Sequence, residues 1–183
     1  MDSKNKKKKK MPRETINVIR TTQRNNIDLT ALADNKANVL LSLNALIITV
    51  VIPLVLGNID FVMERYLYIP LAFMAVTCFT TIFYAAKVLK PNDFDAMKAE
   101  IEAKMDSSPF FFGNFYKMDV EEYFDSIKGL MNDPTMIQSH VAQDLYYIGR
   151  RLGKKMTWIR LAFDIFTIGF FLTLLTFAIV LMV

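Results

Sequence analysis

Three long stretches of this chain contain no charged residue, and they constrain its fold more than any other feature. They cover residues 37–59, 66–86 and 165–183. A helix needs roughly 20 residues to cross the apolar core of a bilayer, and all three stretches are of about that length. A soluble helix this long carries a polar face, which none of the three does. The sequence therefore predicts an all-α integral membrane protein with three transmembrane helices.

The residues before the first stretch are predicted to form a tail and a helix. Residues 1–12 are rich in lysine and are expected to be a basic disordered tail, followed by one membrane domain over residues 13–183. A signal peptide is not expected, because a polar-rich segment separates Lys10 from the apolar run. Pro12 favours a first helical position and no glycine follows before residue 37, so a long amino-terminal helix should continue into the first span.

The distribution of positive charge predicts the orientation in the membrane. Ten of the 22 Lys and Arg residues precede Ala37, and eleven lie between Lys87 and Arg160. Only Arg65 lies in the link between the first two spans. Since cytoplasmic loops carry the excess of positive charge, the amino terminus and residues 87–164 are expected in the cytoplasm. The carboxyl terminus then lies at the periplasmic side of the inner membrane.

Residues 87–164 are predicted to form a helical cytosolic insertion between the second and third spans. Pro91 should end the helix of the second span, because proline lacks the backbone donor that a helix needs. The insertion is expected to begin with a charged helix over 93–105 and an aromatic loop over 107–118. A helix should then run from Asp119 to about Met131, opened by a capping box between Asp119 and Glu122. A further helix should start at Asp133-Pro134 and continue through the third span.

The sequence offers little for catalysis. His140 is the only histidine, and Cys78, the only cysteine, lies within the second span, so a His/Cys metal set cannot be assembled. No phosphate-binding glycine loop or nucleophile motif is present. We therefore expect no enzymatic activity, no cofactor and no bound metal.

Three blocks of sequence resemble a known family. They are ADNKAN at residues 33–38, FGNF at residues 112–115, and DLYYIGRRLGKKMTWIRLAFDIF at residues 144–166. They are similar to the transmembrane effector domain of bacterial Pycsar antiphage systems, and the resemblance covers about residues 14–177. In those systems a cyclase makes a cyclic pyrimidine nucleotide upon infection, and the membrane effector responds by impairing the membrane. Similar proteins carry an amino-terminal HD phosphohydrolase domain, which these 183 residues lack.

The resemblance implies an antiphage effector that permeabilises the inner membrane by oligomerising, which leads to abortive infection. Its trigger would be a nucleotide messenger made by a cyclase or nucleotidyltransferase encoded nearby. The chain has no β-rich segment for a cyclic-nucleotide-binding β-roll, so either the helical insertion or a partner protein senses the messenger. The alternative function is a non-conducting membrane anchor that scaffolds a soluble nucleotide-processing partner.

A nucleotide site is expected where cationic and aromatic side chains gather, since cations bind phosphates and aromatic rings stack on bases. The basic residues also suit contact with lipid phosphates, and the phenylalanines also suit packing of a small core, so both alternatives stay open. The candidate residues are Arg20, Arg24, Phe112, Asn114, Phe115, Arg150, Arg151 and Lys154.

A stripe of small and hydroxyl-bearing residues along the first span is expected to contact another helix or line a water path. Asn38, Ser42 and Thr49 lie on this stripe, whereas Asn44 lies off it and is expected to bond a neighbouring helix. Similar stripes on the other two spans offer more contact surface than one subunit can use. A homo-oligomer, with a tetramer as the working expectation, and contact with membrane lipid are therefore predicted.

Overall fold

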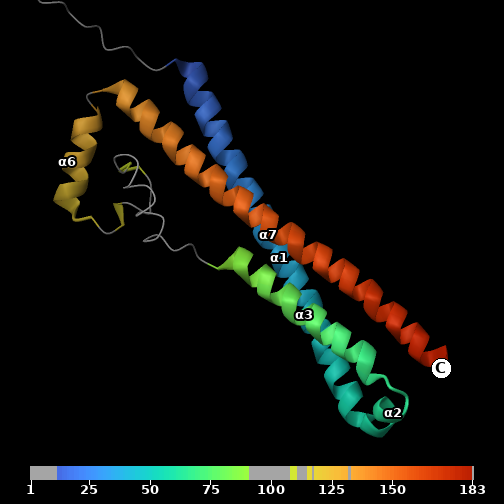
Figure 1. The fold of residues 1–183 in the computed structure, drawn as a ribbon. Coiled ribbons are helices and arrows are strands. Elements are labelled where there is room, and N and C mark those ends of the chain that lie inside the picture. The colour runs from blue at the N-terminus through green and yellow to red at the C-terminus, as the bar shows by residue number, and fades with distance from the viewer. Residues whose placement is uncertain (1–11, 91–107, 111–114, 117, 132, 183) are drawn as a thin grey trace, which may run out of the picture. The chain divides into compact units, whose positions relative to one another are not determined.

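The computed structural model describes residues 12–90, 108–110, 115–116, 118–131 and 133–182. These residues form helices and no strand (Figure 1). The helices are α1 (Arg13–Gly57), α2 (Ile59–Glu64), α3 (Tyr68–Leu89), α6 (Val120–Met131) and α7 (Pro134–Met182). Of these, α1, α3 and α7 are long and apolar enough to cross a membrane. The predicted all-α membrane protein with three transmembrane helices is confirmed, while the helix predicted over 93–105 lies outside the described residues.

The chain divides into two compact units. Residues 29–90 and 152–183 form one, here called the membrane unit, and residues 1–28 and 91–151 form the other, here called the polar unit. Helices α1 and α7 contribute to both units, because neither ends at the boundary. As predicted, the amino-terminal helix continues into the first span, and the helix that starts at Pro134 continues into the third.

A tight turn joins the first two spans, and it contains a short helix that the sequence did not reveal. After α1 ends at Gly57, α2 occupies most of the link. The backbone N–H of Leu67 donates to the carbonyl of Val62 over 2.9 Å, which closes the turn. Tyr66 has a φ of 54°, in the left-handed region that non-glycine residues seldom adopt. The chain can therefore reverse within a few residues, and α3 runs antiparallel to α1 (Figure 1).

Small side chains hold the three spans of the membrane unit together. Its buried core combines Ala33, Ala37 and Leu40 of α1 with residues of α3 and α7, namely Ala85, Val88, Ile159 and Ala162. Alanine lets helix backbones approach closely, which is how helices associate in lipid. One close approach is between Gly169 of α7 and Thr77 of α3, where a side chain on the glycine would overlap the threonine.

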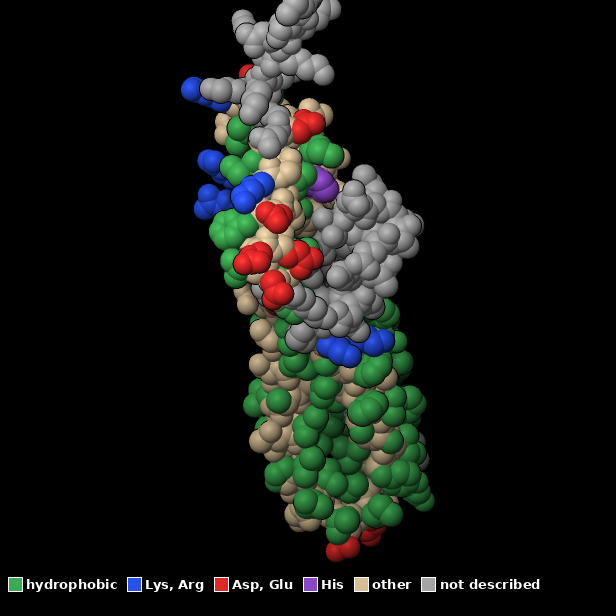
Figure 2. All heavy atoms as spheres, turned by 90° about the vertical axis from the view of Figure 1, so that its left-hand side faces the viewer, with side chains coloured by type: hydrophobic (Ala, Val, Ile, Leu, Met, Phe, Trp, Pro, Cys, Tyr) green, Lys and Arg blue, Asp and Glu red, His purple; other side chains and the backbone are tan. Residues whose placement is uncertain are grey.

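The large apolar side chains of the membrane unit point outward. Phe79 and Phe171 are 74% and 66% exposed, whereas Ala37 and Leu40 are fully buried. A soluble protein rarely exposes such a continuous apolar surface. Figure 2 shows this surface as a band of hydrophobic side chains, with acidic groups at one end. The pattern is that of a helix bundle whose solvent is lipid.

The polar unit contains α6 and the first part of α7. The carbonyl of Asp119 accepts the first hydrogen bond of α6, from the N–H of Tyr123 at 2.9 Å. The Asp133 carboxylate caps α7 by accepting a bond from the N–H of Thr135 at 2.9 Å. Both helices therefore begin where the sequence predicts.

Candidate functional site

The stripe predicted on the first span faces away from the rest of the membrane unit. Asn38, Ser42 and Thr49 are all exposed on α1, as are Ala45 and Pro53 between and beyond them. We call these five residues the α1 seam. The face of α1 that packs within the unit is a different one, formed by Ala33, Ala37, Leu40 and Asn44. The α1 seam therefore places polar side chains on the outer surface of a membrane-spanning helix.

A shallow hollow of about 440 Å³ lies on the α1 seam. It is lined by three polar residues, Asn35, Asn38 and Ser42, and by three apolar ones, Val39, Leu43 and Leu46. The Thr49 hydroxyl donates to the carbonyl of Ala45 over 2.8 Å, so it is satisfied within its own helix. The described residues supply no such bond to the side chains of Asn38 and Ser42. These two groups are the ones that gain most from a neighbour in lipid.

The stripes predicted on the other two spans lie largely inside the subunit; they are Thr77, Thr81 and Tyr84 on α3, and Ala162, Gly169, Thr173 and Thr176 on α7. Thr81 and Ala162 are fully buried, and Thr77 lies so close to Gly169 that a side chain on the glycine would overlap it. The predicted role of these positions in helix contact agrees with their burial. The α1 seam is exposed along its whole length, whereas Thr173 and Thr176 at the far end of the α7 stripe are only partly exposed.

Asn44 is fully buried, but it does not bond a neighbouring helix as expected. Its side-chain amide donates to the carbonyl of Leu40 in the same helix, over 2.7 Å. Its side-chain oxygen has no partner among the described residues, and the same is true of the fully buried Thr81 hydroxyl. The expectation of a bond across helices was wrong because the amide reaches back one turn along α1 instead. Two polar atoms consequently lie unpaired inside the bundle.

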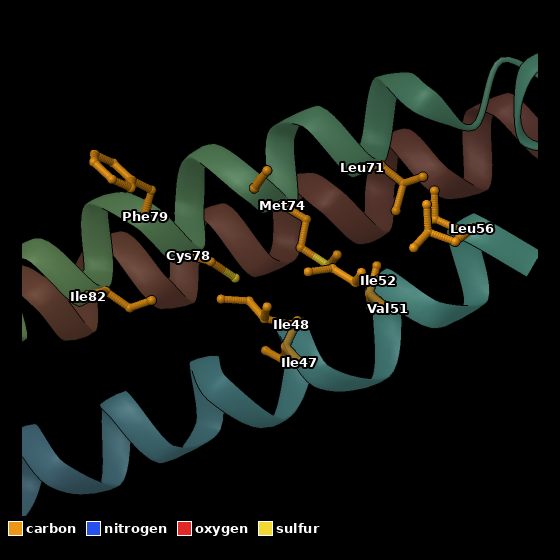
Figure 3. A pocket seen from close by; sticks show the side chains of 12 residues that line it. Ile47, Ile48, Val51, Ile52, Leu56, Leu71, Met74, Cys78, Phe79 and Ile82 are labelled. Atoms are coloured by element: carbon orange, nitrogen blue, oxygen red, sulfur yellow. The ribbon is translucent and has the colours of Figure 1, made fainter. Parts of the chain in front are cut away.

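An apolar groove of about 520 Å³ runs between α1 and α3, beyond the level of Asn44 (Figure 3). Ile47, Ile48 and Val51 line it from α1, and Met74 and Cys78 line it from α3. Figure 3 shows these side chains converging from the two helices. The lining is aliphatic, aromatic and sulfur-bearing, so the groove suits lipid chains and excludes water.

Charged and aromatic side chains of the membrane unit gather where α3 ends. Lys155 donates to the carboxylate of Asp34 over 2.6 Å, in a pair that is largely shielded from solvent. The ammonium of Lys87 lies 4.6 Å from the ring centroid of Trp158, whose ring stacks on Tyr84 at 5.6 Å. Tryptophan, tyrosine and lysine are typical of the level where lipid headgroups begin. This end of the unit therefore lies at a boundary between the bilayer core and the headgroups.

The structure separates the basic residues that the sequence groups on α7. Arg150 and Lys154 are exposed and lie one helical turn apart, Arg150 in the polar unit and Lys154 in the membrane unit. Arg151 is half-buried in the polar unit, and its Nε donates to the carbonyl of Tyr147 over 3.3 Å. Lys155, which follows them, is occupied by Asp34. The exposed cations of this segment are therefore Arg150 and Lys154.

The other predicted ligand-binding residues are partly described. Arg20 and Arg24 are exposed on α1, within the polar unit. Phe115 is half-buried against Tyr123 of α6, with ring centroids 5.4 Å apart, so it packs the small core. Phe112 and Asn114 lie outside the described residues. The stacking face predicted from Phe112 and Phe115 stays a prediction.

A polar cluster in the polar unit was missed by the sequence analysis. The Ser108 hydroxyl donates to the carboxylate of Asp144 over 2.8 Å. Burial raises the pKa of Asp144 above its usual value, although the Ser108 bond and the charges of His140 and Arg151 oppose that rise. Burial likewise lowers the pKa of Arg151, against the effect of Asp144. The sequence does contain a signal for this cluster. Asp144 follows His140 by four residues and precedes Arg151 by seven, and both spacings place side chains on one face of a helix.

Within the part of the chain that the structure describes, no three His, Cys, Asp or Glu side chains are placed to hold a metal ion. The arrangement instead defines a helical membrane protein with a three-span unit, a polar unit on the same helices, and one polar seam left on its lipid-facing surface.

A family model described as "PycTM: Pycsar effector protein domain" matches residues 17–182. The chain belongs to this family, as the resemblance in its sequence predicted, and is thus an effector of antiphage defence. Neither the comparison with curated proteins nor the comparison with solved structures found a match.

Proposed function

We propose that this effector permeabilises the bacterial inner membrane through an assembly of several copies, after a cyclic pyrimidine nucleotide or a related messenger signals infection. The observation that carries the proposal is the outward orientation of Asn38 and Ser42 on α1. Polar side chains on a transmembrane helix associate with partners, because lipid offers them no hydrogen bond. The α1 seam of a second copy provides such partners.

An assembly built on the α1 seam brings polar side chains of several subunits together. If the seams surround a common axis, Asn38, Ser42 and Thr49 line a path that water can enter. If they meet only in pairs, the same residues act as helix contacts. Only the first arrangement lets water and small solutes cross the membrane, so leakage of a trapped solute distinguishes the two.

The proposed sensor is the polar unit, whose exposed cations include Arg20, Arg24 and Arg150. These residues lie on α1 and α7, which are also two of the membrane-crossing helices. A ligand phosphate bound by these cations therefore acts on helices that continue into the bilayer. Lys154 lies one turn beyond Arg150 on α7 and adds charge nearby along that helix.

The proposed topology follows the positive charges. The amino terminus and the polar unit lie in the cytoplasm, where the messenger is made, and the carboxyl terminus lies at the periplasmic face. A reporter fused after Val183 should be active on the periplasmic side, whereas a tag before Met11 should be protected. An even number of crossings would contradict this topology.

Leakage from liposomes tests the proposal directly. The purified chain is reconstituted with a trapped fluorescent dye, and cyclic CMP or cyclic UMP is added. We expect one nucleotide to release the dye, and we expect Ser42→Leu or Thr49→Leu to reduce release without reducing insertion. Val50→Leu is the matched control, because Val50 is exposed on α1 but lies off the seam.

Crosslinking tests the contact itself. A cysteine placed at Ser42 in a Cys78→Ser background should crosslink two copies, and a cysteine at Val50 should do so much less. A chain that stays monomeric in several mild detergents, with neither nucleotide releasing dye nor depolarising cells that express the protein, would contradict the proposal.

A second candidate, a non-conducting anchor for a soluble partner, is favoured by one feature of α6. Val120, Phe124 and Met131 lie on one side of this helix and are 69%, 56% and 68% exposed. An apolar face in the polar unit suits a protein partner. Under this function, Phe124→Ser abolishes partner binding, and the reconstituted chain leaks no dye under any nucleotide.

A further inference from the structure

Two polar side chains are buried inside the membrane unit, and each has a polar atom without a hydrogen-bond partner among the described residues. Asn44 of α1 and Thr81 of α3 are both fully buried. Within the described part of the chain, the Asn44 oxygen and the Thr81 hydroxyl have no partner. Burying a polar atom without a partner is costly, and more so where no water is near.

Thr81 differs in this respect from neighbouring hydroxyls of the same unit. The Thr80 hydroxyl donates to the carbonyl of Val76 over 2.6 Å, and that of Thr173 donates to Gly169 over 2.8 Å. Such bonds back along the helix are the ordinary way for a threonine to be satisfied in lipid. The Thr81 hydroxyl makes no such bond with the residues that the structure describes, although it is fully buried within the bundle.

The two unpaired groups occupy the same level of the bundle. Leu40 and Ala85 belong to one core cluster, and α1 and α3 run antiparallel (Figure 1). Asn44 follows Leu40 by one helical turn, and Thr81 precedes Ala85 by one turn, so both steps lead in the same direction across the membrane. The layers on either side are apolar: the alanine-rich core on one, and the groove of Ile48 and Cys78 on the other.

From this placement we infer that Asn44 and Thr81 form an internal gate, which is dry in the resting subunit and takes up water when the effector permeabilises the membrane. Water can donate to the Asn44 oxygen and pair with the Thr81 hydroxyl, so hydration recovers the bonds that the closed bundle lacks. The free energy of the closed bundle is therefore raised most at the level of Asn44 and Thr81. The inference rests on the proposed permeabilising function and assigns the point where the bundle opens.

The chain contains its own reporter for this event. Cys78, the only cysteine, precedes Thr81 by one helical turn and lines the apolar groove (Figure 3). A thiol reacts as its thiolate, which forms only where water reaches it. A small, permanently charged methanethiosulfonate reagent should therefore label Cys78 slowly in the resting protein and faster when the gate is hydrated.

The test compares labelling rates in liposomes that contain the full chain, with and without cyclic CMP or cyclic UMP. The gate variant combines Asn44→Leu and Thr81→Val, which keep the side-chain shapes and remove the unpaired groups. We expect it to be labelled at least about tenfold more slowly than the natural chain, since one unsatisfied group shifts an opening equilibrium by about that factor. Thr80→Val is the matched control, because the Thr80 hydroxyl is already satisfied, and it should leave the rate unchanged.

Each outcome bears on the inference. Equal labelling of the natural chain and the gate variant would overturn it, with or without nucleotide. Dye release in the natural chain while Cys78 stays unreactive would also overturn it, and would place the water path elsewhere while leaving the proposed function intact. Slower labelling of the gate variant without nucleotide-dependent dye release would support the gate and contradict the proposed trigger.

Discussion

Gly169 allows a close contact between α7 and α3, and replacing it with alanine should loosen the bundle. A Cβ at this position would lie 2.8 Å from the Cβ of Thr77 and closer still to the other two atoms of that side chain. The Cβ is anchored to the backbone of α3, so rotation of the threonine cannot relieve the overlap. The two helices must move apart, and overpacking of this kind costs about 1–3 kcal/mol.

The expected net effect is smaller, because alanine also favours the helix. Replacing glycine by alanine in a helix interior contributes about 1 kcal/mol of stability. Gly153→Ala is the matched control, since it lies on the same helix and in the same unit with no atom within 4 Å of its Cβ position. Both variants gain the same helix propensity. The difference between their free energies of unfolding therefore reports the overlap with Thr77 alone, and it should be about 1–3 kcal/mol.

Unfolding of the reconstituted protein in mixed micelles measures that difference. The Gly169→Ala variant should unfold more readily than Gly153→Ala, and adding Thr77→Ala to it should restore part of the loss by removing the two nearest atoms. Equal stability of the two glycine variants would refute the close contact. A loss that Thr77→Ala does not reduce at all would show that Gly169 acts through something other than Thr77.

Three further predictions concern the polar groups. In a double-mutant cycle of Asp34→Leu and Lys155→Met, the coupling free energy of unfolding should be about 1–2 kcal/mol, which is larger than for exposed ion pairs. If the two substitutions lower the free energy of unfolding additively, the pairing is contradicted. Because burial raises the pKa of Asp144, its contribution to stability should be complete below the usual pKa of 3.8 and lost as pH rises through the raised value. Hydrogen exchange of the polar unit should report this trend in the natural chain, and Asp144→Asn should flatten it; an unchanged pH profile would exclude Asp144 as its source. The fluorescence of Trp158, the only tryptophan, should be quenched more by lipids brominated near the headgroup than at the chain ends, and the reverse order would place this ring in the bilayer centre.

Helix limits were predictable because they depend on neighbours in the sequence. Pro12 and the absence of glycine before residue 37 indicated a long helix that continues into the first span, and the structure confirms it from Arg13 to Gly57. The Asp133 cap depends on two residues only, and α7 begins beside it. The link between the first spans was less predictable: α2 is too short to show a period, and the left-handed Tyr66 that follows it carries no sequence signal.

The rotation of each helix about its axis decides what a side chain contacts, and this depends on partners far away in the sequence. Arg151 and Lys155 appear in one basic cluster, yet Lys155 is paired with Asp34, more than a hundred residues earlier. The same limit applied to Asn44, whose burial depends on which face of α1 packs within the subunit.

Helix α1 has two faces that contain small residues, and its sequence alone does not say which one packs inside the subunit. One face holds Ala33 and Ala37, and the other is the α1 seam with Ser42 and Ala45. Helices α3 and α7 each have one such stripe, of which Thr81 and Ala162 are fully buried, and Ala162 packs in one cluster with Ala33 and Ala37. Ala33 and Ala37 bring no polar group that must be satisfied in a tight contact, although the same face also buries Asn44 further along α1. The choice leaves Asn38 and Ser42 on the lipid side, and a helix whose more polar face is left over in this way is suited to a second, intermolecular contact.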